Sequence, residues 1–82
     1  MDKEEIKDAL TAEIAAELGI DPDGIDDQMS FMRLGISSVQ ALKVVNRLRK
    51  RLAIDINPVA IFEFKTIDDI AEYLADEADD DD

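Results

Sequence analysis

Two neighbouring serines, Ser37 and Ser38, are the side chains of this sequence best placed for chemistry. They lie in the segment 34–40 (LGISSVQ), at the start of a region with helical periodicity. A serine at a helix start is usually an N-cap, whose side-chain oxygen accepts a backbone N–H one turn into the helix. A cap needs only one hydroxyl, so the other is available as an attachment point. A helix N-terminus also stabilises phosphate, which favours a phosphodiester on that hydroxyl.

The chain lacks the residue types that most enzymes use for acid–base or metal chemistry. Its 82 residues include no Cys, no His and no Trp. The usual general base and the commonest transition-metal ligands are therefore missing, and no disulfide can form. A chain of this length buries only about 60% of its unfolded surface, which is enough for one thin core. We therefore expect a non-enzymatic domain without a metal site, whose serine is modified by a separate enzyme.

Charge is distributed very unevenly along the chain, whose net charge is −12. Residues 28–54 contain six basic and no acidic side chains, whereas the segments on either side are strongly acidic. The overall negative charge argues against nucleic acid as a partner, and a polarised surface of this kind steers protein partners. The sequence also has no apolar run long enough to span a bilayer and no signal peptide. We therefore expect a cytoplasmic protein with no membrane contact.

Three segments have the apolar spacing of helices. The first is expected over residues 2–18, with Asp2 as N-cap and Gly19 just past its end. The second is expected from Ser37 or Ser38 to Leu52, and the third follows a capping Thr66. Their predicted inner faces are Ile6, Leu10, Ile14 and Leu18; Ala41, Val45, Leu48 and Leu52, flanked by Leu42 and Val44; and Ile67, Ile70, Ala71 and Leu74.

The connections between these helices are expected to be partly ordered. In the loop 19–36, apolar side chains should fix the chain to the core, and a short helical turn fits within it. Asn57 and Pro58 predict a short helix over 58–63, which buries Val59, Ile61 or Phe62. The loop residues expected to contact the core are Ile20, Ile25, Phe31, Leu34 and Ile36.

The predicted fold is all-α, a small bundle of three main helices and one short helix. Residues 1–75 form the domain, and residues 76–82, which are mostly acidic, are expected to be a disordered tail. The acidic stretch 21–27 is similar to a calcium loop, but the register fails. With Gly24 at the sixth loop position, the first and twelfth positions are Gly19 and Ser30, neither of which supplies a carboxylate. We interpret the stretch as a solvated turn.

The outer face of the second helix is the expected contact surface for partners. Val39 projects toward the polar side, next to the serines. A lone exposed valine is ordinary, but here it is a candidate partner contact. The same face carries basic residues, which are either solvated or dock an acidic partner. The polar side chains of this face are Gln40, Lys43, Arg47, Lys50 and Arg51.

The serine segment resembles the phosphopantetheine attachment motif of acyl carrier proteins. That motif reads Leu-Gly, an apolar residue, Asp, Ser, then Leu or Ile, and Ser38 falls on the modified serine. The preceding Ser30-Phe31 is similar to the loop of this family. Residues 61–74 resemble the stretch that closes carrier domains of modular polyketide synthases, so the resemblance covers about residues 3–75. One departure is Ser37, which stands where the family usually has an aspartate that serves in recognition.

This resemblance implies a four-helix carrier bundle, monomeric when excised. Ser38 would carry a 4′-phosphopantetheine arm, transferred from coenzyme A by a phosphopantetheinyl transferase. The arm would hold acyl intermediates as thioesters for a ketosynthase, an acyltransferase and other synthase domains. Ser37 would then be the cap. The residues expected to meet partners are Ser37, Val39, Gln40, Lys43 and Arg47.

Two other functions remain open from the sequence. A peptidyl carrier of nonribosomal synthesis would have the same fold and the same modified serine. A non-enzymatic docking domain would use its serines only as caps and bind an acidic partner through the basic face. Binding by such a domain would weaken with salt and survive the loss of Ser38.

Overall fold

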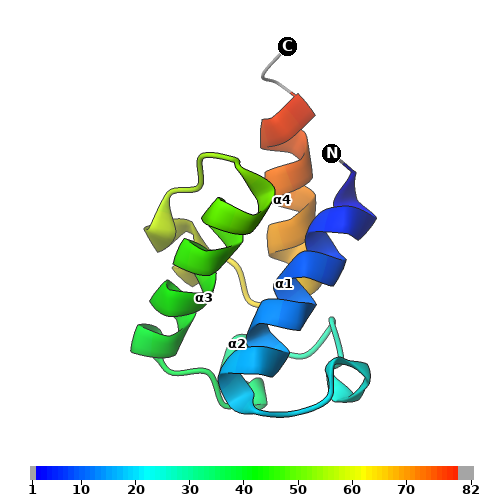
Figure 1. Cartoon of the computed structure of the whole chain (residues 1–82), viewed down its shortest axis with the longest axis vertical. Helices are drawn as coiled ribbons and strands as arrows, with labels where there is room; N and C mark the ends of the chain where they lie inside the picture. Colours follow the sequence, from blue (N-terminus) through cyan, green and yellow to red (C-terminus); the bar gives the residue numbers. More distant parts are fainter. Residues whose placement is uncertain (1, 80–82) are drawn as a thin grey trace.

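The computed structural model describes residues 2–79 and is a bundle of helices (Figure 1). Its elements in chain order are α1 (Lys3–Leu18), η1 (Pro22–Gly24), α2 (Phe31–Leu34), α3 (Ser38–Leu52), η2 (Pro58–Phe62) and α4 (Ile67–Asp79). The predicted all-α class and its three main helices are confirmed. The short helix expected over 58–63 is the 3-10 turn η2. Within residues 2–79, no helix is long and apolar enough to cross a membrane.

Helix α1 begins and ends where its sequence predicts. The Asp2 carboxylate accepts the Glu5 backbone N–H at 2.9 Å, which satisfies one free donor of the first turn. Gly19 has φ 70°, and its N–H donates to the Ala15 carbonyl. This left-handed conformation closes the helix at little cost because glycine has no Cβ.

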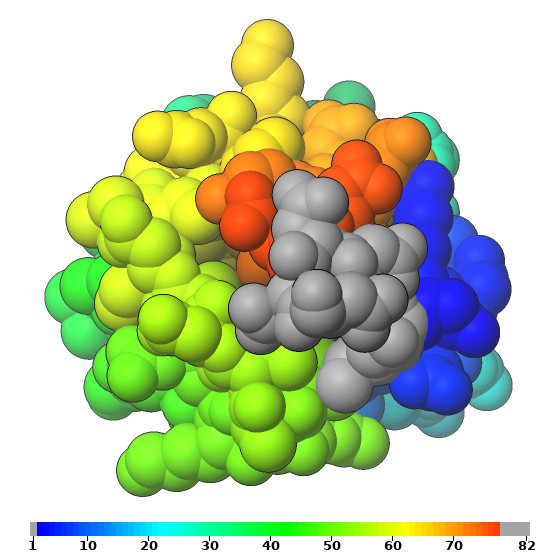
Figure 2. Space-filling view, turned by 90° about the horizontal axis from the view of Figure 1, so that it is seen from above, coloured from blue at the N-terminus to red at the C-terminus, as the bar shows by residue number. Residues whose placement is uncertain are grey.

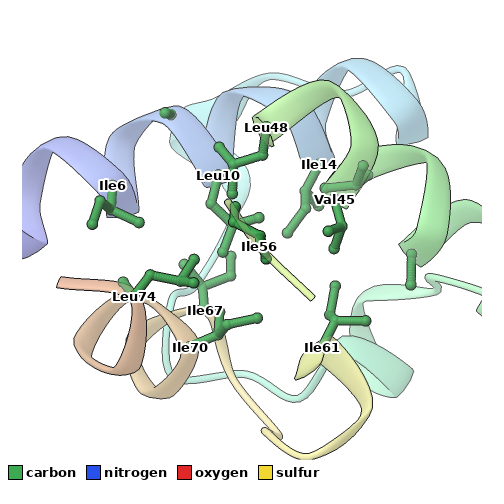
Figure 3. Packing of buried hydrophobic residues seen from close by; sticks show 14 of the residues in the cluster. Ile6, Leu10, Ile14, Val45, Leu48, Ile56, Ile61, Ile67, Ile70 and Leu74 are labelled. Carbon is green, nitrogen blue, oxygen red and sulfur yellow. The ribbon is translucent and has the colours of Figure 1, made fainter. Parts of the chain in front are cut away.

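Apolar side chains of the three long helices point toward one another and form one core (Figure 3). The predicted inner faces of α1 and α4 are buried, apart from Leu18, which is partly buried. In α3, Val44 is as fully buried as Val45, whereas Leu52 is only partly buried and Leu42 is exposed. The core-facing stripe of α3 is therefore rotated slightly toward Val44.

Helix α4 starts at its predicted cap and continues past its predicted end. The Thr66 hydroxyl oxygen accepts the Asp69 N–H at 3.1 Å. The helix then extends to Asp79, so residues 76–79 are helical rather than part of the disordered tail that we expected. Buried Leu74 and Ala75 anchor this last part of the helix to the core. The rest of the expected tail, residues 80–82, lies outside the described residues.

The loop between α1 and α3 contains the turn η1 and the short helix α2. The carboxylates of Asp21 and Asp26 each accept a backbone N–H two residues later, both at 2.9 Å, as expected for an acidic turn. Four of the five apolar loop residues are partly buried against the core: Ile25, Phe31, Leu34 and Ile36. The prediction for Ile20 was wrong, because this side chain is 47% exposed at the loop's start, next to the end of α1.

The turn η2 buries only part of its apolar surface. Ile61 is 2% exposed and belongs to the core, in line with the sequence. Val59 and Phe62 are more than half exposed, because a five-residue 3-10 turn directs only some of its side chains inward. Phe62 therefore projects from the surface, on the side of the molecule where α3 begins.

The start of α3 lies at the opposite end of the molecule from both described chain ends (Figure 1). In the view from above, the start of α1 and the last described turns of α4 lie close together (Figure 2). Two ion pairs join these two helices: the Lys3 ammonium lies 3.0 Å from the Asp68 carboxylate, and the Lys7 ammonium lies 3.6 Å from the same carboxylate. The serine pair is thus presented at the free end of a braced bundle.

Candidate functional site

The two serines at the start of α3 have different structural roles. Ser37 is the N-cap, and its hydroxyl oxygen accepts the Gln40 N–H at 3.2 Å. The Gln40 side-chain oxygen in turn accepts the Ser37 N–H at 2.9 Å. This reciprocal pair is a capping box, which satisfies two backbone donors at once. The prediction that Ser37 serves as the cap is confirmed.

Ser38 is the first residue of α3 and is exposed to solvent. Because Ser37 makes the cap, the fold does not use the Ser38 side chain for that purpose. The N–H groups of the first helical turn and the helix dipole both favour negative charge at this position. An oxygen on Ser38 is therefore accessible to another protein and suited to carry an anionic group.

Gly35 sets the path of the chain into the serine pair. It ends α2 with φ 91°, a left-handed conformation that side chains other than glycine rarely adopt. Its N–H donates to the Met32 carbonyl at 3.1 Å. The sequence left two explanations for Gly35, a close backbone approach or a special dihedral angle. A Cβ at this position would meet no atom within 4 Å, so the dihedral angle is the reason.

Helix α2 is fixed at its start although it has only four residues. The Ser30 hydroxyl oxygen accepts the Arg33 N–H at 3.1 Å and caps its first turn. The Phe31 N–H donates to the Lys65 carbonyl at 3.0 Å, next to an isolated β-bridge between Ser30 and Thr66. These contacts tie the segment before the serines to the segment before α4.

A groove of about 370 Å³ lies beside Ser38. The start of α3 forms one side, α2 forms another, and η2 with the segment after it closes the third. No single stretch of the sequence indicates this groove, because its walls come from distant parts of the chain. The lining residues are Ser30, Phe31, Met32, Ile36, Ser37, Ser38, Ala41, Ile61, Phe62, Phe64 and Lys65.

Val39 and Lys43 are exposed on α3, as a role in partner contact requires, and Val39 is 63% exposed. Gln40 is partly buried and is used in the capping box. Val39 and Lys43 therefore lie on the outer face that the sequence indicated, whereas Gln40 has a structural task in the cap.

The basic face of α3 is less available to a partner than its sequence suggests. The Arg47 guanidinium donates to the Glu13 carboxylate at 2.8 Å and to that of Glu17 at 3.1 Å. Arg51 also reaches Glu13, at 3.3 Å. The hydrogen bond to Glu13, followed by that to Glu17, raises the pKa of Arg47 above its ordinary value. The role of Arg47 in partner contact stays a prediction, and a partner would meet an arginine that is already paired with α1.

The described residues contain no group of three or more His, Cys, Asp or Glu side chains arranged to hold a metal ion. In the loop after α1, the carboxylates of Asp21 and Asp26 instead accept backbone N–H groups of their own turns.

Comparison with known proteins places the serine segment in a family. The family described as "Phosphopantetheine attachment site" matches residues 8–74. Kotanin synthase of Aspergillus niger is 36% identical over 61 residues, which are 74% of this chain and 4% of that protein. Polyketide synthase PksN of Bacillus subtilis is 32% identical over 72 residues, which are 88% of this chain and 1% of that protein. The chain thus spans only a small part of these relatives.

A solved structure has the same fold along nearly its whole length. It is a free-standing peptidyl carrier protein from an uncharacterized secondary metabolic pathway of Acinetobacter baumannii. The TM-score is 0.85 at 28% identity, with 94% of this chain and 96% of that chain covered. Because the family match spans most of the chain, including both serines and the groove, the protein is a carrier domain of the phosphopantetheine-attachment family.

Proposed function

We propose that this carrier domain holds acyl intermediates as thioesters on a 4′-phosphopantetheine arm attached to Ser38. The cofactor of its family is covalently attached 4′-phosphopantetheine. The observation that carries the assignment to Ser38 is the division of roles at the start of α3. Ser37 is used as the cap, whereas Ser38 is exposed at the first helical residue.

The attachment step transfers a phosphopantetheinyl group from coenzyme A. The Ser38 oxygen bonds to the phosphorus next to the pantetheine, the pyrophosphate P–O bond breaks, and adenosine 3′,5′-bisphosphate leaves. The hydroxyl proton passes to a base of the transferase, because this chain has no histidine to accept it. The new phosphodiester carries one negative charge at the N-terminus of α3, where the dipole stabilises it. The arm then supplies the thiol on which acyl groups are held.

The partners in this proposal are a phosphopantetheinyl transferase and the ketosynthase, acyltransferase and other domains of a polyketide synthase. Val39 and Lys43 are the exposed residues that meet them beside Ser38. Ser37 and Gln40 contribute by fixing the start of the helix. Coenzyme A as the donor agrees with a cytoplasmic site of action, and the domain acts as a monomeric unit when excised.

The direct test is incubation with coenzyme A and a broad-specificity transferase, followed by intact mass measurement. The wild type and Ser37→Ala should gain one phosphopantetheinyl group, and Ser38→Ala should gain none. Ser37→Ala should also lose about 1 kcal/mol of stability, the usual cost of deleting an N-cap. Modification of Ser38→Ala but not of Ser37→Ala would reverse the assignment. No gain under conditions that modify a control carrier would refute the proposal.

A peptidyl carrier of nonribosomal synthesis is the second candidate, because the matched solved structure is a peptidyl carrier protein. The sequence relatives instead favour a polyketide context. Loading separates the two. Acylation of the primed protein by an acyltransferase supports the polyketide assignment, whereas selective aminoacylation by an adenylation domain supports the peptidyl one.

A docking domain that uses α3 to bind an acidic partner is less favoured than it was from the sequence. Two of the basic side chains on which it would depend, Arg47 and Arg51, are paired with α1. Binding that persists in Ser38→Ala and weakens with salt would support it.

A further inference from the structure

Lys7 of α1 binds carboxylates from three parts of the chain. Its ammonium lies 2.9 Å from the carboxylate of Asp27 in the loop after α1 and 3.4 Å from that of Glu4 in the same helix. It also lies 3.6 Å from the carboxylate of Asp68 in the first turn of α4. The Lys7 side chain is only 19% exposed, so salt screens these ion pairs less than fully exposed ones. Lys7 therefore joins the loop to both α1 and α4.

The part of the loop that Lys7 binds, residues 27–31 (the strap), lies along the start of α4 and the residues before it. The Asp68 N–H donates to the Asp27 carbonyl at 3.1 Å, at one end of the strap. The Phe31 N–H donates to the Lys65 carbonyl at 3.0 Å, at the other end. The strap is therefore fixed at both of its ends by backbone hydrogen bonds, and the Lys7 ion pair is added at its first residue.

The strap leads directly into α2, because Phe31 is both its last residue and the first residue of that helix. Helix α2 and Ser38 line the same groove. The side chains of Met32 and Arg33 on α2 are exposed. An enzyme that reaches the Ser38 oxygen therefore meets α2 as well, and the position of α2 contributes to how tightly that enzyme binds.

The three carboxylates around Lys7 share one ammonium, so its loss would leave like charges close together. Such charges repel one another. Lys3 would still neutralise Asp68, to which it lies at 3.0 Å. Asp27 is the carboxylate that the strap carries, so the repulsion would push the strap away from α1 and α4. Conformations in which α2 is displaced from Ser38 would then be populated.

We infer that Lys7 is a positioning residue for the attachment reaction: by binding Asp27 and Asp68 it holds the strap, and the strap keeps α2 in place beside Ser38. This inference rests on the proposed attachment at Ser38. Lys7 acts through the strap and not on the reacting atoms. Its loss should therefore weaken the binding of the transferase and leave the chemical step at bound Ser38 unchanged.

Priming kinetics of Lys7→Gln, followed by intact mass with coenzyme A and a broad-specificity transferase, test the inference. The KM for the carrier should rise about threefold to tenfold, because apparent affinity falls with the fraction of molecules in the binding-competent conformation. The kcat should stay within about twofold of the wild type. Amide hydrogen exchange of the unprimed protein gives an independent measurement. Exchange should become faster at the N–H groups of Phe31 and Asp68 but not at that of Ala41 inside α3.

Lys3→Gln is the matched control. Lys3 is also on α1 and also pairs with Asp68, but the strap partner Asp27 is bound by Lys7. This variant should keep the KM of the wild type and its exchange rate at Phe31, and urea unfolding checks that both variants are folded. Asp27→Asn removes the strap's own carboxylate and should raise the KM and the exchange rate in the same direction as Lys7→Gln.

Two outcomes separate this inference from the proposed function. If Lys7→Gln and Asp27→Asn match Lys3→Gln in KM and in exchange at Phe31, the positioning role is overturned and the attachment at Ser38 stands. If the wild type gains no mass under conditions that modify a control carrier, the attachment is overturned, and the positioning role with it.

Discussion

Ala53 gives the sharpest test of the backbone at the end of α3. It ends the helix with φ 54° and ψ 39°, and it is the non-glycine residue with positive φ among the described residues. The left-handed conformation costs a residue with a Cβ about 1–2 kcal/mol. Ala53→Gly removes this cost, and it sacrifices little packing because Ala53 is exposed. The unfolded chain gains about 0.4–1 kcal/mol of conformational entropy from the same change.

The backbone cost that is removed exceeds the entropy that the unfolded chain gains, so Ala53→Gly should stabilise the domain by about 0.5–1 kcal/mol. For a domain of this size that corresponds to a rise of about 2–8 °C in the thermal midpoint. Thermal and urea unfolding followed by circular dichroism measure both quantities. Ala16→Gly is the matched control, an exposed position inside α1 where the same change should cost about 1 kcal/mol. A loss of stability in Ala53→Gly as large as that in Ala16→Gly would refute the reasoning.

Two further predictions concern the ion pairs between the helices. Arg47→Gln should lose about 1 kcal/mol of unfolding free energy in low salt, because it removes the ion pairs of Arg47 with two glutamates of α1, whereas exposed Lys43→Gln should stay near the wild type. Equal free energies of unfolding for the two variants in urea titrations would contradict a contribution of these ion pairs to stability. The hydrogen bond from Lys3 lowers the pKa of Asp68 in the folded protein. The contribution of this carboxylate to the free energy of unfolding is therefore present above the unfolded pKa of about 3.9, and it is lost as pH falls through the folded pKa. Asp68→Asn should therefore be less stable than the wild type at pH 7 and approach it in acid, and a constant difference across pH would rule this out.

The sequence was sufficient where local chemistry decides the structure. Asp2, Gly19, Ser37 and Thr66 mark helix ends because each makes a hydrogen bond or adopts a dihedral angle that its residue type favours. The inner faces of the helices followed from their 3.6-residue period, since one side of each long helix must be buried.

What the sequence missed depends on contacts between distant segments. A short helical turn was expected in the loop, but its position at α2 was not, because four residues are too few to display a period and the turn is held by the pairing of Phe31 with Lys65. The sequence predicts Arg47 as a surface cation, because its partner Glu13 belongs to α1, a distant segment of the chain. The groove beside Ser38 has walls from three parts of the chain, so no single stretch indicates it.

The placement of both described chain ends away from Ser38 has a practical consequence. The molecule is 35 Å in its longest dimension. A tether at residue 2 or residue 79 would hold the bundle at one end, and Ser38 would lie at the opposite end. A small rotation of the bundle about the tether then moves Ser38 much farther than it moves the tethered end. For experiments, a tag, resin or fluorophore attached near residue 2 or residue 79 leaves the end of the molecule that carries Ser38 facing outward.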